Sequence, residues 1–225
     1  MTRLAADRQF WIHASGFPPD KTVVYPDHAR VQHLAEVAGK RVLEYGCGGG
    51  ADAMSYLKAG AEHVTLVDIV PDNLETSRRR IEELLGPRML ARAQFWWLTA
   101  SDALPPADVT YDVINSHGVL HHIEEPMMHV VLRALHARLR PTGWATFMLY
   151  TEHLRQRCDW IIAPRLEQGW AEDAAFGSCT DGDGCIARHY TEAAGREVIE
   201  RAGFRIEDVQ VYNCGDFRTF YCRRP

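Results

Sequence analysis

The sequence lacks a long apolar run and an excess of basic residues, and both absences limit what the protein can be. None of its 225 residues falls in a stretch that approaches the roughly 20 apolar residues of a membrane span. Charged residues occupy the N-terminus, where a secretory signal needs an apolar stretch. We therefore expect a cytoplasmic protein with no membrane partner. The formal net charge of −5 argues against a nucleic-acid partner, which demands a broad basic face.

The sequence also lacks a C-x-x-C pair, an internal repeat and a low-complexity tract. Its six cysteines are scattered, at Cys47, Cys158, Cys179, Cys185, Cys214 and Cys222. This spacing indicates neither a zinc knuckle nor a redox motif. In a reducing compartment we expect mostly buried, free thiols. Cys179 and Cys185 flank a glycine-rich loop, and a disulfide bond between them remains an alternative.

What the sequence does contain is an alternation of short apolar runs and helical patterns between residues 41 and 150. Helical patterns cover about 51–60, 71–85 and 126–140, and Pro71 and Pro126 suit the first turn of a helix. The strand candidates are Arg41–Tyr45, His63–Val67, Gln94–Leu98, Tyr111–Asn115 and Trp144–Leu149. This alternation predicts right-handed βαβ units, and therefore a doubly wound α/β fold with a parallel sheet covered on both faces.

The pattern changes after Tyr150. Residues 151–190 hold helix-like pieces, including Leu154–Leu166, and then a run rich in glycine and aspartate. A last helix starts after Thr191, and the strands Phe204–Tyr212 and Asp216–Arg223 follow, joined by a turn short enough to make them antiparallel. We expect one domain over 1–225. Its parts are an N-terminal helical lid (1–40), a cofactor-binding core (41–150), a substrate-side insertion (151–190) and a final helix with antiparallel strands (191–225).

The segment Glu44–Ala51 joins a strand to a helix and contains four glycines. Glycine lets the backbone turn tightly and approach a ligand without a Cβ clash. By itself, Gly46-x-Gly48-x-x-Ala51 also fits the fingerprint that holds a dinucleotide pyrophosphate. A nicotinamide cofactor is therefore one alternative.

Carboxylates near this loop favour a different cofactor. Glu44 lies two residues before the first glycine, where it is awkward for a pyrophosphate but suits an ammonium group. Asp68 ends the second strand and can accept hydrogen bonds from ribose hydroxyls. Ser101-Asp102-Ala103 follows the third strand, where Asp102 can accept from an adenine amino group. The carboxyl ends of parallel strands meet in one crevice, so these groups converge on one ligand.

Six stretches in order resemble the class I S-adenosylmethionine-dependent methyltransferases over nearly the whole chain. They are 42–50 (VLEYGCGGG), 64–80, 101–105 (SDALP), 111–123 (YDVINSHGVLHHI), 139–150 and 190–204. The resemblance implies a Rossmann-like fold, mostly parallel with an antiparallel C-terminal strand. It also implies S-adenosylmethionine as the cofactor, with contacts from Glu44, Gly46, Cys47, Gly48, Gly50, Asp68, Ile69, Ser101, Asp102, Ala103, Asn115 and His117.

The implied reaction is transfer of a methyl group to O or N of a small-molecule metabolite by in-line displacement, in specialised metabolism. Two other uses of the cofactor stay open. One is an intramolecular attack that cyclises or cleaves S-adenosylmethionine and gives methylthioadenosine, and the other is a non-catalytic module that senses it. The sequence does not bear on the acceptor's identity or on the oligomeric state.

Histidines and the insertion supply the remaining candidates. His117, His121 and His122 follow the fourth strand, and we expect His121 to orient or deprotonate the acceptor. No carboxylate or cysteine completes a recognisable ligand set around them, so we expect no metal site. Tyr25 and His28 in the N-terminal segment can face the methyl group. Tyr150, Arg188 and Tyr190 join His121 as substrate candidates, because cationic residues in the insertion suit an anionic substrate.

Overall fold

The computed structural model describes residue 21 and residues 26–101, 103–182 and 184–225. Two of the site candidates, Tyr25 and Asp102, lie outside these ranges, as does most of the expected N-terminal lid. The described ranges include a central sheet and the helices that cover it.

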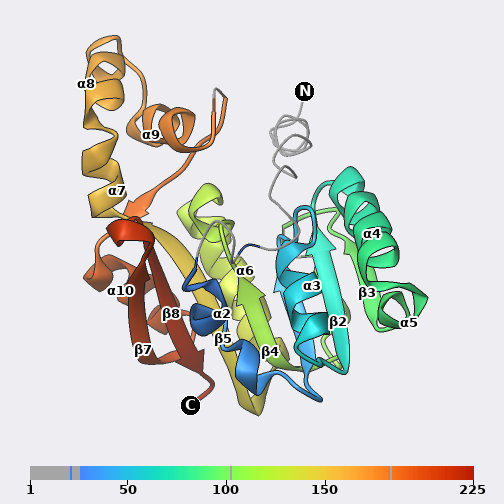
Figure 1. Cartoon of the computed structure of the whole chain (residues 1–225). Coiled ribbons are helices and arrows are strands. Elements are labelled where there is room, and N and C mark those ends of the chain that lie inside the picture. Colours follow the sequence, from blue (N-terminus) through green and yellow to red (C-terminus); the bar gives the residue numbers. More distant parts are fainter. Residues whose placement is uncertain (1–20, 22–25, 102, 183) are drawn as a thin grey trace.

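A single mixed sheet forms the centre of the molecule (Figure 1). Its strands are β3 (Ala93–Trp97), β2 (His63–Asp68), β1 (Arg41–Tyr45), β4 (Tyr111–Ser116), β5 (Leu139–Thr151), β8 (Phe217–Arg223) and β7 (Arg205–Tyr212), in that spatial order. The first five pair in parallel, whereas β8 runs antiparallel to both β5 and β7. A short strand, β6 (His189–Tyr190), pairs with the end of β5. The sheet confirms the predicted fold class.

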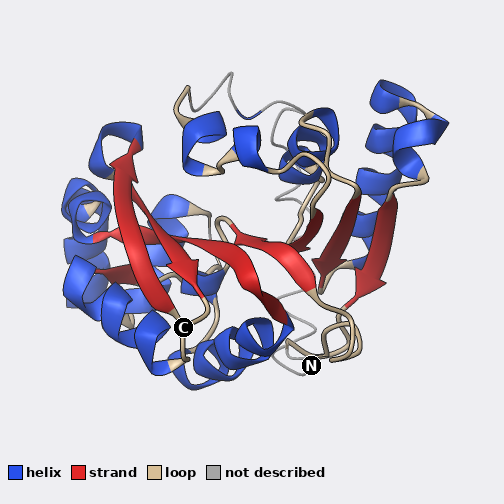
Figure 2. Cartoon of the chain, turned by 90° about the horizontal axis from the view of Figure 1, so that it is seen from below, coloured by secondary structure: helices blue, strands red, loops and turns tan. Residues whose placement is uncertain are grey.

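Helices cover both faces of this sheet (Figure 2), which explains why its inner strands are apolar at consecutive positions. Val42 and Leu43 in β1 point to opposite faces, and each joins a different apolar cluster. On one side Val42 packs with α3 (Ala51–Lys58) and α4 (Pro71–Leu85). On the other, Leu43 packs with α6 (Glu125–Arg138) and α10 (Glu192–Arg201).

Short elements connect these layers. They are α2 (His28–Val31), η3 (Leu34–Glu36), α5 (Pro87–Leu90), η4 (Leu120–His122) and η5 (Asn213–Gly215). None of the described helices is long and apolar enough to cross a bilayer.

The segment after β5 forms three helices, α7 (Glu152–Arg157), α8 (Asp159–Glu167) and α9 (Glu172–Thr180). The side chain of Thr151 accepts a hydrogen bond from the Leu154 amide and so caps α7. Figure 1 shows α8 and α9 projecting beyond the end of the sheet. Ile162 and Phe176 pack on Met148 and Tyr150 of β5, so these helices are anchored at the carboxyl edge of the sheet.

The helix-like pieces expected over Leu154–Leu166 are two helices, α7 and α8, which meet at Cys158. The predicted start of the fifth strand was wrong. The sequence predicts a strand from Trp144, but β5 begins at Leu139 and so contains Pro141 and Gly143, where the pairing with β4 shifts register. A Cβ on Gly143 would lie 2.6 Å from the Asp112 carbonyl oxygen, so this glycine permits the close approach of β4.

Candidate active site

The loop between β1 and α3 is shaped by glycines with positive φ. Gly46 has φ +78°, and a Cβ there would lie 2.3 Å from Cγ2 of Val119. Gly50, with φ +75°, precedes α3, and its Cβ would lie 2.8 Å from Oγ of Ser77. Gly48 differs, because no described atom lies within 4 Å of its built Cβ and it lines a cavity. The first two glycines are thus required by protein packing, whereas Gly48 leaves room for a ligand.

The carboxylate of Asp68 holds this loop in place. Oδ2 accepts a hydrogen bond from the Gly48 amide at 2.8 Å, and Oδ1 accepts from the Val70 amide at 2.9 Å. The side-chain amide of Asn73 donates to Oδ1 at 3.3 Å. Burial raises the pKa of Asp68, although these donors oppose the shift. One side chain therefore joins the glycine loop, the end of β2 and the start of α4.

A cavity of about 620 Å³ lies between this loop and the insertion. Eight of the predicted site residues line it, namely Gly46, Cys47, Gly48, Asp68, Ile69, Ser101, His117 and Tyr150. Its opposite wall contains apolar and aromatic residues from β5, the insertion and the C-terminal hairpin, including Met148, Leu154 and Phe217. The glycine loop and the insertion therefore line the same cavity.

The other described candidates lie outside the cavity lining. They are Glu44, Gly50, Ala103, Asn115, His28, His121, Arg188 and Tyr190. Ala103 is engaged through its carbonyl, which accepts from the Trp96 indole at 2.8 Å. Asn115 is buried, and its Oδ1 accepts from the Thr146 hydroxyl at 2.9 Å.

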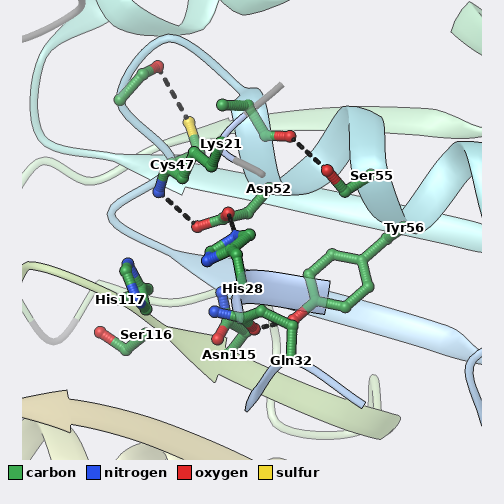
Figure 3. A network of polar contacts seen from close by, with 12 residues as sticks. Lys21, His28, Gln32, Cys47, Asp52, Ser55, Tyr56, Asn115, Ser116 and His117 are labelled. Carbon is green, nitrogen blue, oxygen red and sulfur yellow. Dashed lines mark hydrogen bonds and ion pairs between the residues drawn. The ribbon is translucent and has the colours of Figure 1, made fainter. Parts of the chain in front are cut away.

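A buried cluster of charged groups lies beneath the glycine loop (Figure 3). Asp52, in the first turn of α3, pairs with Nζ of Lys21 at 2.7 Å and with Nε2 of His28 at 2.5 Å. Burial acts to raise the pKa of Asp52, but Lys21 and His28 outweigh it, so that pKa is lowered. Burial and the charge of Asp52 raise the pKa of Glu44 well above its usual value. Glu44 Oε2 has no hydrogen-bond partner among the described atoms.

His117 connects this cluster to the cavity. Its ring lies 5.0 Å from that of His28, edge to face, and its Nε2 shares a hydrogen bond with the hydroxyl of Tyr212. Burial lowers the pKa of His117 well below its usual value. At neutral pH the ring is therefore uncharged, because burial disfavours the imidazolium.

The two following histidines differ in position. His121 is fully buried and stacks on Tyr150, with ring centroids 3.7 Å apart, whereas His122 lines the cavity. Burial lowers the pKa of both rings. The substrate-facing role of His121 stays a prediction, and the structure places Tyr150 and His122, rather than His121, at the cavity wall.

Three arginines of the insertion, including the substrate candidate Arg188, are paired with acidic side chains. Arg188 donates to the Ile123 carbonyl at 2.7 Å and to Asp173 at 3.3 Å. Arg155 pairs with Asp159 and Glu172, and Arg157 with Asp216. Tyr190 is buried, with its hydroxyl 3.9 Å from the Met128 sulfur. Arg188 and Tyr190 therefore hold the insertion and the last helix to the core.

Sequence reasoning missed several residues at this site, among them Lys21, Asp52, Asp181, Cys185, Tyr212 and Phe217. Only Asp52 had a local signal, since it follows the glycine loop directly in the first turn of a helix. The others approach through the insertion, the C-terminal hairpin or the N-terminal segment, whose paths depend on tertiary packing.

A family model described as a methyltransferase domain matches residues 27–209. The chain belongs to the class I S-adenosylmethionine-dependent methyltransferases. The chain is 30% identical over 117 residues to a ubiquinone biosynthesis O-methyltransferase of Albidiferax ferrireducens, covering 52% of the chain and 44% of the relative. It is 28% identical over 146 residues to the enzyme of that name from Xanthomonas euvesicatoria, covering 64% and 57%. The chain spans about half the length of the curated relatives it matches.

Solved structures have the same fold as this chain. Magnesium protoporphyrin IX methyltransferase of Synechocystis, with bound S-adenosylhomocysteine, superposes with a TM-score of 0.66 at 15% identity, covering 98% of this chain and 84% of that one. The 1,6-didemethyltoxoflavin N1-methyltransferase of Burkholderia thailandensis gives 0.62 at 20% identity, covering 98% and 88%.

The residues present fit S-adenosylmethionine, the cofactor of this family. Gly48 offers an open backbone face toward the cavity, and Asp68 ends β2 at the same place. Glu44, expected beside the cofactor's ammonium group, is buried outside the cavity lining, and its Oε2 has no hydrogen-bond partner among the described atoms.

Proposed function

We propose that this methyltransferase transfers a methyl group to a hydroxyl oxygen of a small aromatic acceptor. The observation that carries the proposal is the shared cavity, with the glycine loop on one side and an aromatic wall on the other. Tyr150 and Phe217 are stacked in that wall, with ring centroids 5.7 Å apart and an interplanar angle of 22°. Such a surface suits the face of a flat ring.

The names of the curated relatives support oxygen as the acceptor atom. The relatives from Albidiferax ferrireducens and Xanthomonas euvesicatoria are both called ubiquinone biosynthesis O-methyltransferases. The N1-methyltransferase of similar fold makes nitrogen the other acceptor atom to test.

The side chains around the cavity supply positioning. The cofactor, when bound, provides an electrophilic methyl group on a sulfonium, so the protein has chiefly to align a nucleophile and exclude water. Gly48 and Asp68 are the cavity residues that would hold the cofactor. His117, uncharged at neutral pH and oriented by Tyr212, would hydrogen-bond the acceptor hydroxyl, whose proton would pass to water.

The test is an assay of S-adenosylmethionine with a panel of small phenols and the matching anilines. We expect S-adenosylhomocysteine and a methylated phenol. Methylation of the anilines alone would contradict the choice of oxygen. Methylthioadenosine formed without any acceptor would instead indicate that the cofactor itself is the substrate.

A variant tests the aromatic wall. Phe217→Ala is expected to raise the acceptor KM about tenfold or more, because burying an aromatic side chain against a ligand contributes about 1.5–3 kcal/mol. The Kd of S-adenosylmethionine, measured by calorimetry, should change little. Val211→Ala, at an exposed position of the same hairpin, is the matched control. Equal KM values for the two variants would exclude Phe217 from acceptor binding.

A further inference from the structure

Three side chains with metal-binding atoms meet in the wall of the cavity, on the side of the insertion. They are His122 in η4, Asp181 at the end of α9 and Cys185 four residues later, and one ligand atom from each lies within 4.8 Å of the others. All three line the cavity. The expectation of no metal site rested on the absence of a carboxylate or cysteine beside the histidines, and the fold brings one of each to His122.

The His122 ring is oriented as in many metal sites. Nδ1 lies 2.8 Å from the Ile186 carbonyl oxygen. A carbonyl can only accept, so the ring proton is on Nδ1 and the lone pair is on Nε2. That Nε2 lies 3.9 Å from Oδ1 of Asp181. Metal-binding histidines commonly donate their second ring N–H to a backbone carbonyl in this way.

The side chains of Asp181 and Cys185 also contact neighbouring polar groups. Asp181 Oδ1 accepts from the Tyr150 hydroxyl at 2.9 Å, and Oδ2 accepts from the Thr180 hydroxyl at 2.5 Å. Sγ of Cys185, a buried residue, lies 3.7 Å from Nδ1 of His122, on the same ring as the proposed ligand atom Nε2. Neighbouring ligand atoms in a tetrahedral site with bonds of about 2.0–2.3 Å lie about 3.3–3.6 Å apart. The three ligand atoms here lie within 4.8 Å of one another, so the side chains of Cys185 and Asp181 have to turn toward Nε2 to close the site around an ion.

We propose that His122, Asp181 and Cys185 bind a divalent transition-metal ion, with Zn²⁺ as the best match. Imidazole nitrogen, carboxylate oxygen and thiolate sulfur are all zinc ligands, whereas Mg²⁺ and Ca²⁺ prefer oxygen alone. Three protein ligands leave a fourth position for a molecule in the cavity that all three residues line. A site of that kind accepts an oxygen or sulfur ligand from a small molecule.

The site is inferred from these side chains alone, and only its role in methyl transfer rests on the proposed function. An acceptor hydroxyl or thiol at the fourth position would ionise at lower pH, because a bound cation stabilises the anion. The released proton would pass to water. The site therefore selects acceptors with a metal-binding heteroatom.

Co²⁺ is the probe, because it occupies zinc sites and its bond to a thiolate absorbs in the near ultraviolet. The metal-free protein, without methyl donor or acceptor, is titrated with Co²⁺. We expect one equivalent to bind with a thiolate band, and Zn²⁺ to displace it. Cys185→Ser should abolish the band, whereas Cys214→Ser, at an exposed cysteine outside the cluster, should retain it. Asp181→Asn should keep the band and raise the Co²⁺ Kd at least about tenfold.

A wild-type protein without a thiolate band would overturn the metal site, and so would a band that survives Cys185→Ser or an unchanged Kd in Asp181→Asn. Circular dichroism of each variant shows that it is folded. Because no methyl transfer is measured, these results stand apart from the acceptor assay. A protein that methylates phenols but binds no Co²⁺ refutes the metal site alone.

Discussion

Single residues of the glycine loop have separable tasks. Gly46 and Gly50 are fixed by packing against Val119 and Ser77, whereas Gly48 faces the cavity. The sequence pattern predicts the loop but does not distinguish these tasks, because the neighbours come from segments far along the chain. The position of Asp68 at the end of a strand predicts its place at the site, but its contacts to the loop depend on the fold.

Gly46→Ala is expected to lower the free energy of unfolding by about 2–4 kcal/mol, since positive φ and overpacking against Val119 each cost about 1–2 kcal/mol. Urea denaturation gives this value. Gly39→Ala is the control, because Gly39 has φ +70° but no described atom within 4 Å of its built Cβ, so it reports backbone strain alone. If both variants lose the same free energy of unfolding, Val119 accommodates the added methyl group without an energetic cost.

The strands and helices of the core could be predicted from the sequence, but the way in which the insertion docks on them could not. The parallel strands and the helices α4 and α6 follow from apolar periodicity, which is local, and only their ends shift. The insertion is different, because its sequence indicates helices but not where they dock. Arg188 illustrates this: a guanidinium expected to suit a substrate instead joins α9 to the segment after β4.

Removing that link should loosen the insertion. Arg188→Met is expected to speed amide hydrogen exchange in residues 172–180 about tenfold or more, because a hydrogen bond from a charged donor contributes about 1.5–3 kcal/mol. Arg196→Met is the matched control, since the Arg196 partner Glu192 lies in the same helix, α10, and not in α9. Unchanged exchange in Arg188→Met would mean that apolar packing alone holds α9.

At the scale of the whole molecule, three described histidines lie at or beside the cavity: His117 and His122 line it, and His121 is buried next to His122. Burial lowers the pKa values of His117, His121 and His122. In the unfolded chain each ring regains its ordinary pKa of about 6.5, so below that pH the unfolded state binds more protons than the folded state. The contribution of these rings to the free energy of unfolding is therefore fully present above about pH 6.5. As the pH is lowered below that value, the free energy of unfolding decreases by up to about 1.4 kcal/mol per pH unit for each ring.

His121→Phe isolates one of these contributions, because phenylalanine keeps the stacking on Tyr150 and does not titrate. The free energy of unfolding, measured in urea at several pH values between 5 and 7.5, should fall less steeply for the variant as pH decreases. Glu44, whose raised pKa acts in the opposite direction, contributes equally to both proteins and cancels in the comparison. Parallel curves would show that His121 titrates alike in the folded and unfolded chain.

Among the described strands, β7 forms one end of the mixed sheet, and it pairs there with β8 alone. That strand places Arg205, Glu207 and Asp208 at exposed positions within its eight residues. A strand from another chain would have to bring its backbone against these charges and strip them of water. The charged edge of the β7–β8 hairpin therefore disfavours edge-to-edge association with another chain, even at high protein concentration.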